Sequence, residues 1–486
     1  MNHAEFDALS GPTEIIAKYI AEADFEDFPD VVIQKAKNCI LDSLGCALGG
    51  YASEPGANVA QIIGTLGGQD ATIIGSGVKA SPPNAALANT YMANIMDYDD
   101  TYRGHPGCTV NTATLAAGEM THASGKDVLT ASIVGYEIHS RVGASLYYSP
   151  TTNAKLRGIM HQTYGAVSAA AKILGGRLDQ VFDALGIAGA TAPVQSNAKT
   201  SGEENVPPTM KIGFYACSLI GVFSALLAKN GVTGPHNILD GETGFWRMMA
   251  ADSCDFEKLV HGLGTEYEIL NVAFKPYSCC RWFHSSLDAL FEIIKEHEID
   301  SENITKITVQ TTAGKSKVDY LTNPRPENCV GAVFSLPYSI AVALSGIPPG
   351  PRWISHEMMS DKKILDLARK VQCSFQQKSE SEHMKDVHKW PATVEVTAGG
   401  ITHSKHVDYP RGSPRNMVSD DMLREKFLSL ANPVIGENKA KKVMEMVGIL
   451  EQVGDIAKLT ALLGPPVNIV KPDVAQRAAL PQVGSS

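Results

Sequence analysis

The spacing of apolar residues changes twice along this chain, and this restricts the possible folds more than any other feature. Up to about residue 270 the apolar positions recur at helical spacing, as in Pro29 to Leu48, in segments rich in Ala and Gly. Two later stretches, Asn303 to Thr312 and Thr393 to Val407, alternate apolar and polar residues as strands do, and the second has a glycine turn at its centre. Helical spacing returns from Ser419 onward. The sequence therefore predicts a mainly α protein, with a large all-helical domain and an inserted smaller α+β domain.

We expect the domain boundaries where the spacing changes. The helical domain covers residues 1–270, the α+β domain covers residues 271–410, and residues 411–464 are helices that rejoin the first domain. Helices are also expected inside the α+β domain, at Phe283 to His297, Ser335 to Leu344 and Lys362 to Val371. The polar, proline-spaced segment 465–486 is expected to be a loosely ordered tail.

The composition limits which partners the protein can bind and where it can reside. The 486 residues are 44% hydrophobic and 19% charged, as in soluble globular proteins, and the net charge of -10 argues against nucleic-acid binding. The longest apolar run, Leu219 to Ala228, is about half of the roughly 20 residues that a membrane span needs. The acidic N-terminus lacks the pattern of a signal or transit peptide. Nine scattered cysteines without a C-x-x-C pair predict reduced thiols, so we expect a cytoplasmic protein with no membrane contact.

The densest group of ionisable residues follows a stretch without charge. Pro82 to Met96 predicts a buried helix, after which three aspartates come within four positions, namely Asp97, Asp99 and Asp100. Glycine and proline then place His105 in a loop. Carboxylates oppose the dipole at a helix C-terminus, so they need a partner or a functional reason. This stretch is the best candidate for an active site. The structural alternative is that Asp99 or Asp100 caps the next helix while Asp97 is solvated.

Three further segments hold basic residues suited to bind an anion. His161 stands at the start of a small-residue helix, where backbone N–H groups favour an anion, although a lone histidine there is also typical of a cap or a core group. Lys211 stands among apolar residues and prolines, so it is either a buried lysine with an anionic partner or a surface lysine. Lys275, Arg281 and His284 place three basic groups within ten residues, and these are either a binding cluster or solvated side chains.

Four motifs, in this order, resemble the MmgE/PrpD family. They are Asp-Tyr-Asp-Asp-Thr with a following His-Pro (97–106), Gly-Val-Thr-Gly-Pro (231–235), Lys-Pro-Tyr-x-Cys-Cys-Arg-x-x-His-x-x-x-Asp-Ala (275–289) and Phe-Ser-Leu-Pro-Tyr (334–338). The resemblance spans residues 12–460. It implies a helical domain with a smaller α+β lid, a homodimer, and neither a metal nor an organic cofactor.

Carried over residue by residue, the resemblance implies an active site made of Asp97, Thr101, His105, His161, Lys211, Lys275 and Tyr338. We assign catalysis to His105, His161, Asp97, Lys211 and Tyr338, and substrate binding to Thr101, Arg103, Lys275, Arg281 and His284. Family members commonly have His-Pro-Ser where this chain has His-Pro-Gly at 105–107, so a hydroxyl that binds a carboxylate is missing. The loop before His105 is also shorter than in many members. Arg103, within that loop, is our candidate to replace the lost contact.

The reactions of the family make or break a bond next to a carboxylate through a carbanion-like state. Such a reaction needs a base with a pKa near neutrality, which the histidines supply, and fixed positive charge, which the lysines supply. Asp97 would orient or tune one of the histidines. The expected activity is a cofactor-independent lyase on a small anionic di- or tricarboxylate. We place a hydro-lyase of the 2-methylcitrate dehydratase type before a cis-aconitate-type decarboxylase or an epimerase.

Two other classes of protein stay open from the residues alone. A metal-dependent hydrolase would take its ligands from Asp97, Asp99, Asp100, His105 and His161. No His-Glu-x-x-His pair occurs, however, and the lysines would repel a cation. A non-catalytic helical scaffold would turn over no carboxylate.

Overall fold

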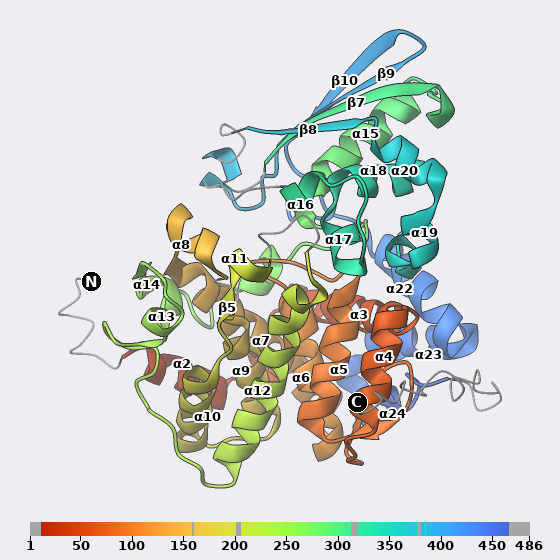
Figure 1. The fold of residues 1–486 in the computed structure, drawn as a ribbon. Helices are drawn as coiled ribbons and strands as arrows, with labels where there is room; N and C mark the ends of the chain where they lie inside the picture. Colours follow the sequence, from red (N-terminus) through yellow and green to blue (C-terminus); the bar gives the residue numbers. More distant parts are fainter. Residues whose placement is uncertain are drawn as a thin grey trace, which may run out of the picture.

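The computed structural model describes residues 11–157, 160–200, 206–312, 319–376, 381–383 and 385–465. The tail expected over residues 465–486 lies outside the described residues except for Pro465. The described chain is mainly helical, as the apolar spacing predicts (Figure 1).

A bundle of long helices forms the first half of the described chain. Its main members are α2 (Pro12–Glu22), α3 (Asp30–Tyr51), α4 (Glu54–Gly64), α5 (Pro82–Ile95), α6 (Pro106–Thr121), α7 (Gly125–Ser145), α9 (Gln162–Ile173), α10 (Leu178–Thr191) and α12 (Ile212–Lys229). A short antiparallel pair, β1 (Ala71–Thr72) with β2 (Lys79–Ala80), connects α4 to α5. Helices α5, α6, α7 and α9 are buried over most of their length, so the elements on either side of the three aspartates lie in the core.

Small residues let the central helices approach closely, as the Ala- and Gly-rich composition predicts. A Cβ atom on Gly165 of α9 would lie 2.7 Å from the Cβ of His139 on α7. A Cβ on Gly135 of α7 would lie 2.5 Å from a methyl group of Val110 on α6. Contacts this short are not tolerated in a well-packed interior. Glycine is therefore required where α6, α7 and α9 meet.

The second region combines a four-stranded sheet with shorter helices. The strand order is β10 (Ile401–Val407), β9 (Ala392–Ala398), β7 (Ile304–Thr311) and β8 (Val371–Phe375). The pair β7 and β8 is parallel, and the other neighbours are antiparallel. The turn between β9 and β10 lies at Gly399 and Gly400, which have positive φ angles and suit a two-residue hairpin. The predicted strands and their glycine turn are confirmed.

Helices cover the sheet and connect its strands. They include α15 (His284–Glu296), α17 (Cys329–Phe334), α18 (Leu336–Leu344), α19 (His356–Ser360) and α20 (Lys362–Ala368). Helix α15 packs against β9 and β10, while α18 packs against α20 and β8. The sequence prediction was wrong at one end: the helix expected to reach Val371 stops at Ala368, and the next residues form β8. Local spacing did not reveal that strand, because its partner β7 lies some 60 residues earlier and pairs with it in parallel.

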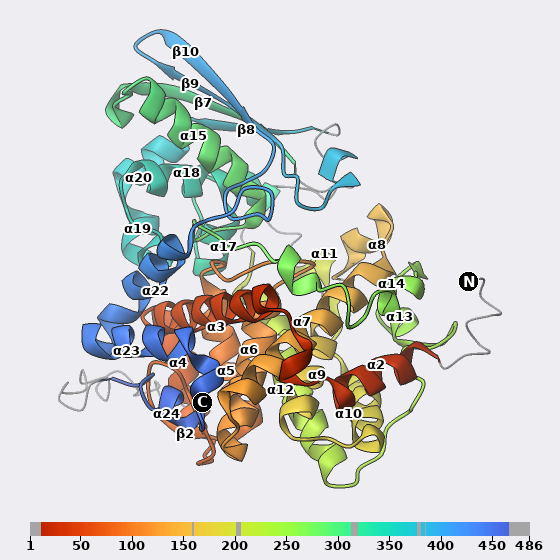
Figure 2. The same cartoon turned by 180° about the vertical axis from the view of Figure 1, so that it is seen from behind.

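The last helices pack on the first part of the chain. Helix α22 (Asp420–Ile435) lies along α3, and α23 (Glu437–Gly448) packs against both (Figure 2). Helix α22 begins directly after Ser419, where the sequence predicts that helical spacing returns. The side chain of Ser419 accepts a hydrogen bond from the backbone of Met422 and is the N-cap of this helix. In both views the sheet region lies at one end of the helical bundle.

One stretch of the described chain, Pro208–Lys229, is long and apolar enough to cross a membrane by length and composition alone. This stretch is longer than the uninterrupted apolar run Leu219 to Ala228, because it also includes the polar residues between shorter apolar runs. Buried core helices of soluble proteins pass the same test, and 59% of this stretch is buried inside the protein. Helix α12 packs against α5, α9 and α10, as a bundle helix does.

Candidate active site

The predicted buried helix ends where the acidic stretch begins. Helix α5 stops at Ile95, and Asp97 follows with a φ of 50°, a left-handed conformation that a non-glycine residue seldom adopts. The residue is 2% exposed, so the expectation of a solvated Asp97 is wrong. Unusual backbone conformations of this kind concentrate at functional sites.

Two lysines from distant segments meet at the carboxylate of Asp97. Lys211, at the start of α12, pairs with Oδ1, and Lys275 pairs with Oδ2 at 3.0 Å. The Lys275 ammonium also donates to the backbone carbonyl of Asp97 at 2.7 Å. Both lysines are buried, so the alternative that they are surface or solvated lysines is wrong. Lys211 also lies near the rings of Phe214 and Phe334, whose electron-rich faces attract a cation.

The charges in this group shift one another's pKa values. Burial alone would raise the pKa of Asp97, but the charges of Lys211 and Lys275 outweigh it and hold that pKa well below its usual range. Burial acts to lower the pKa of Lys275, and the carboxylates of Asp97 and Asp99 overcome it, so the net shift is upward. Both shifts favour the charged forms of Asp97 and Lys275.

His105 lies between two carboxylates at the start of α6. Its Nδ1 is 3.1 Å from Oδ2 of Asp99, and its Nε2 is 3.8 Å from Oδ1 of Asp97. The edge of the Phe214 ring packs on the imidazole, with the ring centroids 4.9 Å apart. The side chain is 15% exposed, the most accessible of this group. Burial lowers the pKa of His105, although the charge of Asp99 acts to raise it. The lowered pKa favours the neutral imidazole. We call Asp97, Asp99, His105, Lys211 and Lys275 the Asp97 cluster.

Asp100 has the structural role that was considered as an alternative. Its Oδ1 accepts a hydrogen bond from the backbone of Gly107 in the first turn of α6, and its Oδ2 accepts one from the hydroxyl of Tyr136. Burial and the charge of Asp42 raise the pKa of Asp100 to about 7. The interpretation as a helix cap is therefore confirmed for Asp100, whereas Asp97 and Asp99 face the cluster.

His161 lies against the loop that carries His105. Its Nε2 donates to the carbonyl of Arg103 at 2.8 Å, and the adjacent Gln162 accepts a hydrogen bond from the backbone of His105 at 2.9 Å. The ring of His139 on α7 lies 5.0 Å from that of His161 and bonds to the carbonyl of Tyr102. Helices α7 and α9 thus fix the loop of residues 101–105 from one side, while Lys211 and Lys275 approach Asp97 from other segments.

The other proposed site residues do not join the cluster through their side chains. The Tyr338 hydroxyl donates to the carbonyl of Trp353 at 2.8 Å, inside the sheet region. Arg281 donates to the carbonyl of Arg411 at 3.0 Å, and His284 bonds to that of Cys279. Burial lowers the pKa of Arg281 to about 10. In this structure these three side chains hold backbone of the second region.

Two residues of the shortened loop have different surroundings from those expected of substrate ligands. The Thr101 hydroxyl donates to the carbonyl of Gly104 at 2.8 Å, and the backbone of Thr101 pairs with that of Ala273, which ties the loop to the segment before Lys275. The Arg103 side chain is exposed, and its guanidinium carbon is 5.7 Å from the Tyr102 ring centroid. Its carbonyl, rather than its side chain, contacts His161.

The donor set does not suit a metal ion. Among the residues that the structure describes, no group of three His, Cys, Asp or Glu side chains is arranged to hold one. Both oxygens of Asp97 already accept hydrogen bonds from ammonium groups, which would repel a cation. The arrangement instead presents a basic imidazole beside two fixed positive charges.

Sequence reasoning placed Asp99 in the candidate stretch but did not predict its contact with His105, and it missed Asn94, His139 and Gln162. Asp99, and not Asp97, contacts Nδ1 of His105, and the amide of Asn94 donates to both oxygens of Asp99. His139 and Gln162 hold the loop. Asn94 and Asp99 carry a weak signal, since both are polar residues in an apolar neighbourhood. The other two become visible only when α7 and α9 are packed together.

Comparison with known proteins extends over nearly the whole chain. The family model of the MmgE/PrpD N-terminal domain matches residues 14–257, and that of the MmgE/PrpD C-terminal domain matches residues 277–452. Cis-aconitate decarboxylase of Aspergillus terreus (strain NIH 2624 / FGSC A1156) is 27% identical, covering 96% of this chain and 98% of its own. The Homo sapiens cis-aconitate decarboxylase is 26% identical, covering 94% and 95%. A mitochondrial 2-methylcitrate dehydratase of Yarrowia lipolytica is 23% identical, covering 88% and 85%.

Proposed function

This chain belongs to the MmgE/PrpD family, and from that premise we propose that it is a cofactor-independent lyase acting on a small di- or tricarboxylate at the Asp97 cluster. One observation carries the proposal: two buried ammonium groups share the Asp97 carboxylate, next to a histidine whose Nε2 is 3.8 Å from the same carboxylate. Fixed positive charge in a buried site is what a developing carboxylate-stabilised carbanion requires.

The proposed chemistry assigns a separate task to each group. Lys211 and Lys275 bind the carboxylates of the substrate and stabilise the negative charge that develops next to one of them. His105 transfers the proton, because its neutral form is favoured and its ring is the most accessible of the cluster. His161 holds the loop in place and is the candidate for a second proton transfer once the substrate is bound.

Two lyase reactions fit these tasks. In a carboxy-lyase the bond to one carboxylate breaks, carbon dioxide leaves, and the electron pair on carbon takes a proton from a histidine that has bound a proton from solvent before the step. In a hydro-lyase a base removes a proton from carbon, the bond to the hydroxyl breaks, and a second group protonates the departing hydroxyl as water. The two decarboxylases compared above are matched over more of this chain than the dehydratase, so we place the carboxy-lyase first and the hydro-lyase second.

The burial of the cluster requires a movement to admit substrate. Asp97, Lys211 and Lys275 are at most 2% exposed, and Lys275 belongs to the segment that leads into the sheet region. Residues 271–410 are therefore proposed to act as a lid, in which a shift of the segment around Ala273 opens the loop at Thr101. Helices α22 and α23, which pack on α3, would stay with the bundle.

A product assay tests the function directly. The purified protein is incubated, after EDTA treatment, with cis-aconitate, 2-methylcitrate, citrate, an alkylcitrate and iminodisuccinate, and the products are read by mass spectrometry. Loss of carbon dioxide supports the carboxy-lyase, and loss of water supports the hydro-lyase. His105→Ala is expected to abolish turnover, whereas His261→Ala, a change at an exposed histidine, is expected to retain it. If none of these acids is converted, or if activity returns only with a divalent ion, the proposal is rejected.

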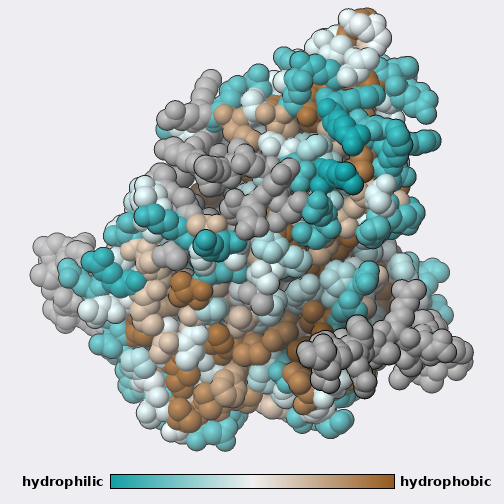
Figure 3. All heavy atoms as spheres, viewed as in Figure 1, coloured by the Kyte–Doolittle hydropathy of each residue, from teal (hydrophilic) through white to brown (hydrophobic). Residues whose placement is uncertain are grey.

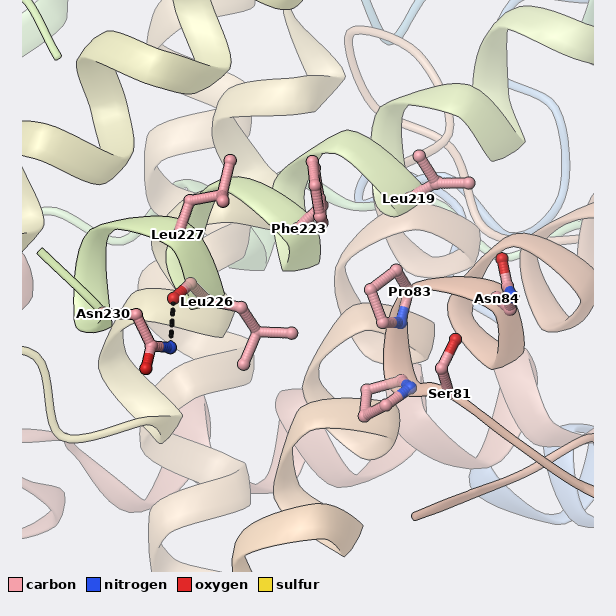
Figure 4. Close-up of a pocket in the computed structure, with 9 residues that line it drawn as sticks. Ser81, Pro83, Asn84, Leu219, Phe223, Leu226, Leu227 and Asn230 are labelled. Atoms are coloured by element: carbon pink, nitrogen blue, oxygen red, sulfur yellow. Dashed lines mark hydrogen bonds between the residues drawn. The ribbon is translucent and has the colours of Figure 1, made fainter. Parts of the chain in front are cut away.

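A homodimer is proposed as the working form. An open apolar hollow lies between the start of α5 and one face of α12, lined by Pro82, Pro83, Leu219, Phe223 and Leu227 (Figure 4). Phe223 is 50% exposed at its centre. Apolar side chains gather on this face of the bundle (Figure 3). Exposed apolar patches of this kind are typical of protein interfaces, and a second copy of the chain is the partner that we propose.

A further inference from the structure

The fully buried carboxylate of Asp99 has no task in the proposed proton transfers. Both of its oxygens lie within hydrogen-bond distance of Nδ1 of His105, at 3.1 and 3.2 Å. Its other polar contacts include the amide nitrogen of Asn94, 3.1 Å from each oxygen, and the thiol of Cys108. Asp99 is 0% exposed, and no other cation lies as close to it among the described residues.

This geometry determines which imidazole nitrogen carries the proton. A carboxylate can only accept hydrogen bonds, so Nδ1 must donate if it faces Asp99. If Nδ1 were unprotonated, its lone pair would oppose a buried negative charge. The amide of Asn94, also 3.1 Å from Nδ1, cannot reverse this preference, because its hydrogens are needed by the two carboxylate oxygens. With its proton on Nδ1, neutral His105 presents an unprotonated Nε2 toward Asp97 and the lysines.

We propose that Asp99 is a positioning residue, which holds His105 as the Nδ1–H tautomer and thereby makes Nε2 the atom that accepts and returns the proton of the reaction. The proposal rests on the proposed lyase function for its catalytic consequence only. Asp99 does not touch the substrate. Its effect is exerted through the orientation and charge of the imidazole, as a buried carboxylate behind a catalytic histidine does in other hydrolytic and transfer enzymes.

The charged groups around His105 come from several elements. Asp97 and Asp99 face it from its own loop, Lys275 from the segment before the sheet region, Lys211 from α12, and His139 from α7. Asp99 acts to raise the pKa of His105, whereas burial and Lys275 act to lower it. Removal of the Asp99 charge therefore moves the pKa of His105 downward.

The matched pair Asp99→Asn and Asp100→Asn tests this role. Both changes neutralise a buried aspartate of the same loop, but only Asp99 contacts His105. Asp99→Asn is expected to reduce kcat about 10²-fold or more, with a much smaller change in KM, and to move the limb of the kcat profile that reports His105 to lower pH. This is the acidic limb if His105 removes a proton and the basic limb if it donates one. Asp100→Asn is expected to leave the position of that limb unchanged. If this limb lay at the same pH in the wild type and in Asp99→Asn, the proposal would be overturned.

A second measurement does not depend on activity. NMR of protein labelled with ¹⁵N-histidine distinguishes the two tautomers, and a His105→Gln variant identifies the signal. The wild type and Asp100→Asn should show the Nδ1–H form at His105, and Asp99→Asn should lose it. An Nε2–H form in the wild type would overturn the role of Asp99, whereas a protein that turns over no carboxylate but shows the expected tautomers would reject only the lyase function.

Discussion

At the scale of single residues, Gly107 shows how a missing side chain can be a packing requirement. The sequence comparison treated it as a lost hydroxyl for binding substrate. A Cβ atom at this position would lie 2.6 Å from Oδ1 of Asp100 and 2.7 Å from Oγ of Ser43. The space that a serine would need is therefore occupied by the carboxylate that caps α6.

Gly107→Ser is expected to destabilise the protein by about 1–3 kcal/mol, because the new side chain displaces the Asp100 cap. It should not lower KM, since the hydroxyl would point into the packed interior rather than toward the lysines. Urea denaturation and steady-state kinetics measure the two effects. Gly448→Ala, where nothing lies within 4 Å of the new methyl group, is the control. A variant with improved KM and unchanged stability would contradict this account.

Asp100 also makes stability depend on pH in an unusual direction. Its pKa is raised to about 7 by burial and by Asp42, so the folded state holds a proton that the unfolded state releases near pH 4. The stability that this proton contributes is fully present below the unfolded pKa and is lost as pH rises toward 7. The neutral side chain of Asp100→Asn has no such dependence.

The free energy of unfolding of the wild type, relative to Asp100→Asn, should therefore fall by about 1.4 kcal/mol per pH unit between about pH 4.5 and 6.5. Denaturation at a series of pH values measures it. Glu137, whose pKa burial raises to about 7, contributes the same slope to both proteins and cancels in the comparison. For Asp70→Asn, a change at an exposed aspartate, the free energy of unfolding should change with pH as it does for the wild type. If the free energies of unfolding of the wild type and Asp100→Asn changed with pH in the same way, Asp100 would be ionised over this whole pH range.

At the scale of secondary-structure elements, the buried Lys426 links α22 to α3 and to the loop after α5. The buried ammonium of Lys426 pairs with Asp42 of α3 at 2.7 Å and donates to the carbonyls of Tyr98 and Lys275. One side chain thus joins the C-terminal helices, the first long helix and the backbone of two of the three segments that form the Asp97 cluster. Asp42 raises the pKa of Lys426, against burial, so the lysine stays charged.

Lys426→Met is expected to cost about 3–5 kcal/mol of unfolding free energy, since it leaves the buried Asp42 without its counter-charge. The double variant Lys426→Met with Asp42→Leu should recover much of the loss. Lys441→Met, which removes an exposed pair with Glu437, should leave the unfolding free energy close to that of the wild type. Urea denaturation of the four proteins gives the comparison. Equal losses for Lys426→Met and Lys441→Met would mean that the buried tie adds no stability.

The elements themselves were largely predictable from local signals. Ser419 as an N-cap, the glycine turn after β9 and the uncharged helix before Asp97 are all set by residues within one or two turns, so sequence spacing reveals them. Strand β8 was not predictable in this way. Its pairing with β7 is parallel and non-local, and the five residues gave too short a pattern to separate it from the helix before it.

At the scale of the whole molecule, the candidate site was only partly predictable. The family resemblance named Asp97, His105, Lys211 and Lys275, and these four side chains meet in the structure. From the residues alone, the need of a buried charge for an opposite charge suggested only that a buried Lys211 would have an anionic partner. Which carboxylate contacts the histidine was not predicted. Asp97 and Asp99 differ by two positions, and after the turn at Asp97, with its positive φ, Asp99 contacts Nδ1 of His105 while Asp97 lies on the side of Nε2.

The apolar hollow leads to a prediction about assembly. The wild type should behave as a dimer in size-exclusion chromatography with light scattering. Phe223→Lys is expected to give monomers, because it places a charge at the centre of the proposed interface. Tyr147→Lys, a change at another exposed aromatic residue outside the hollow, is the control and should remain dimeric. A monomeric wild type, or a dimer unaffected by Phe223→Lys, would assign the apolar face another role.

The sharing of one carboxylate by two ammonium groups also bears on which acids can be taken up. In the resting protein the positive charge is neutralised internally, so an incoming acid has to exchange with Asp97 as the partner of the lysines. A monoacid offers a single anionic group and gains little by replacing a carboxylate that both lysines already hold. An acid with two or three such groups can engage the ammoniums together. For the proposed lyase, the exchange with Asp97 thus favours acids with two or three carboxylates over monoacids.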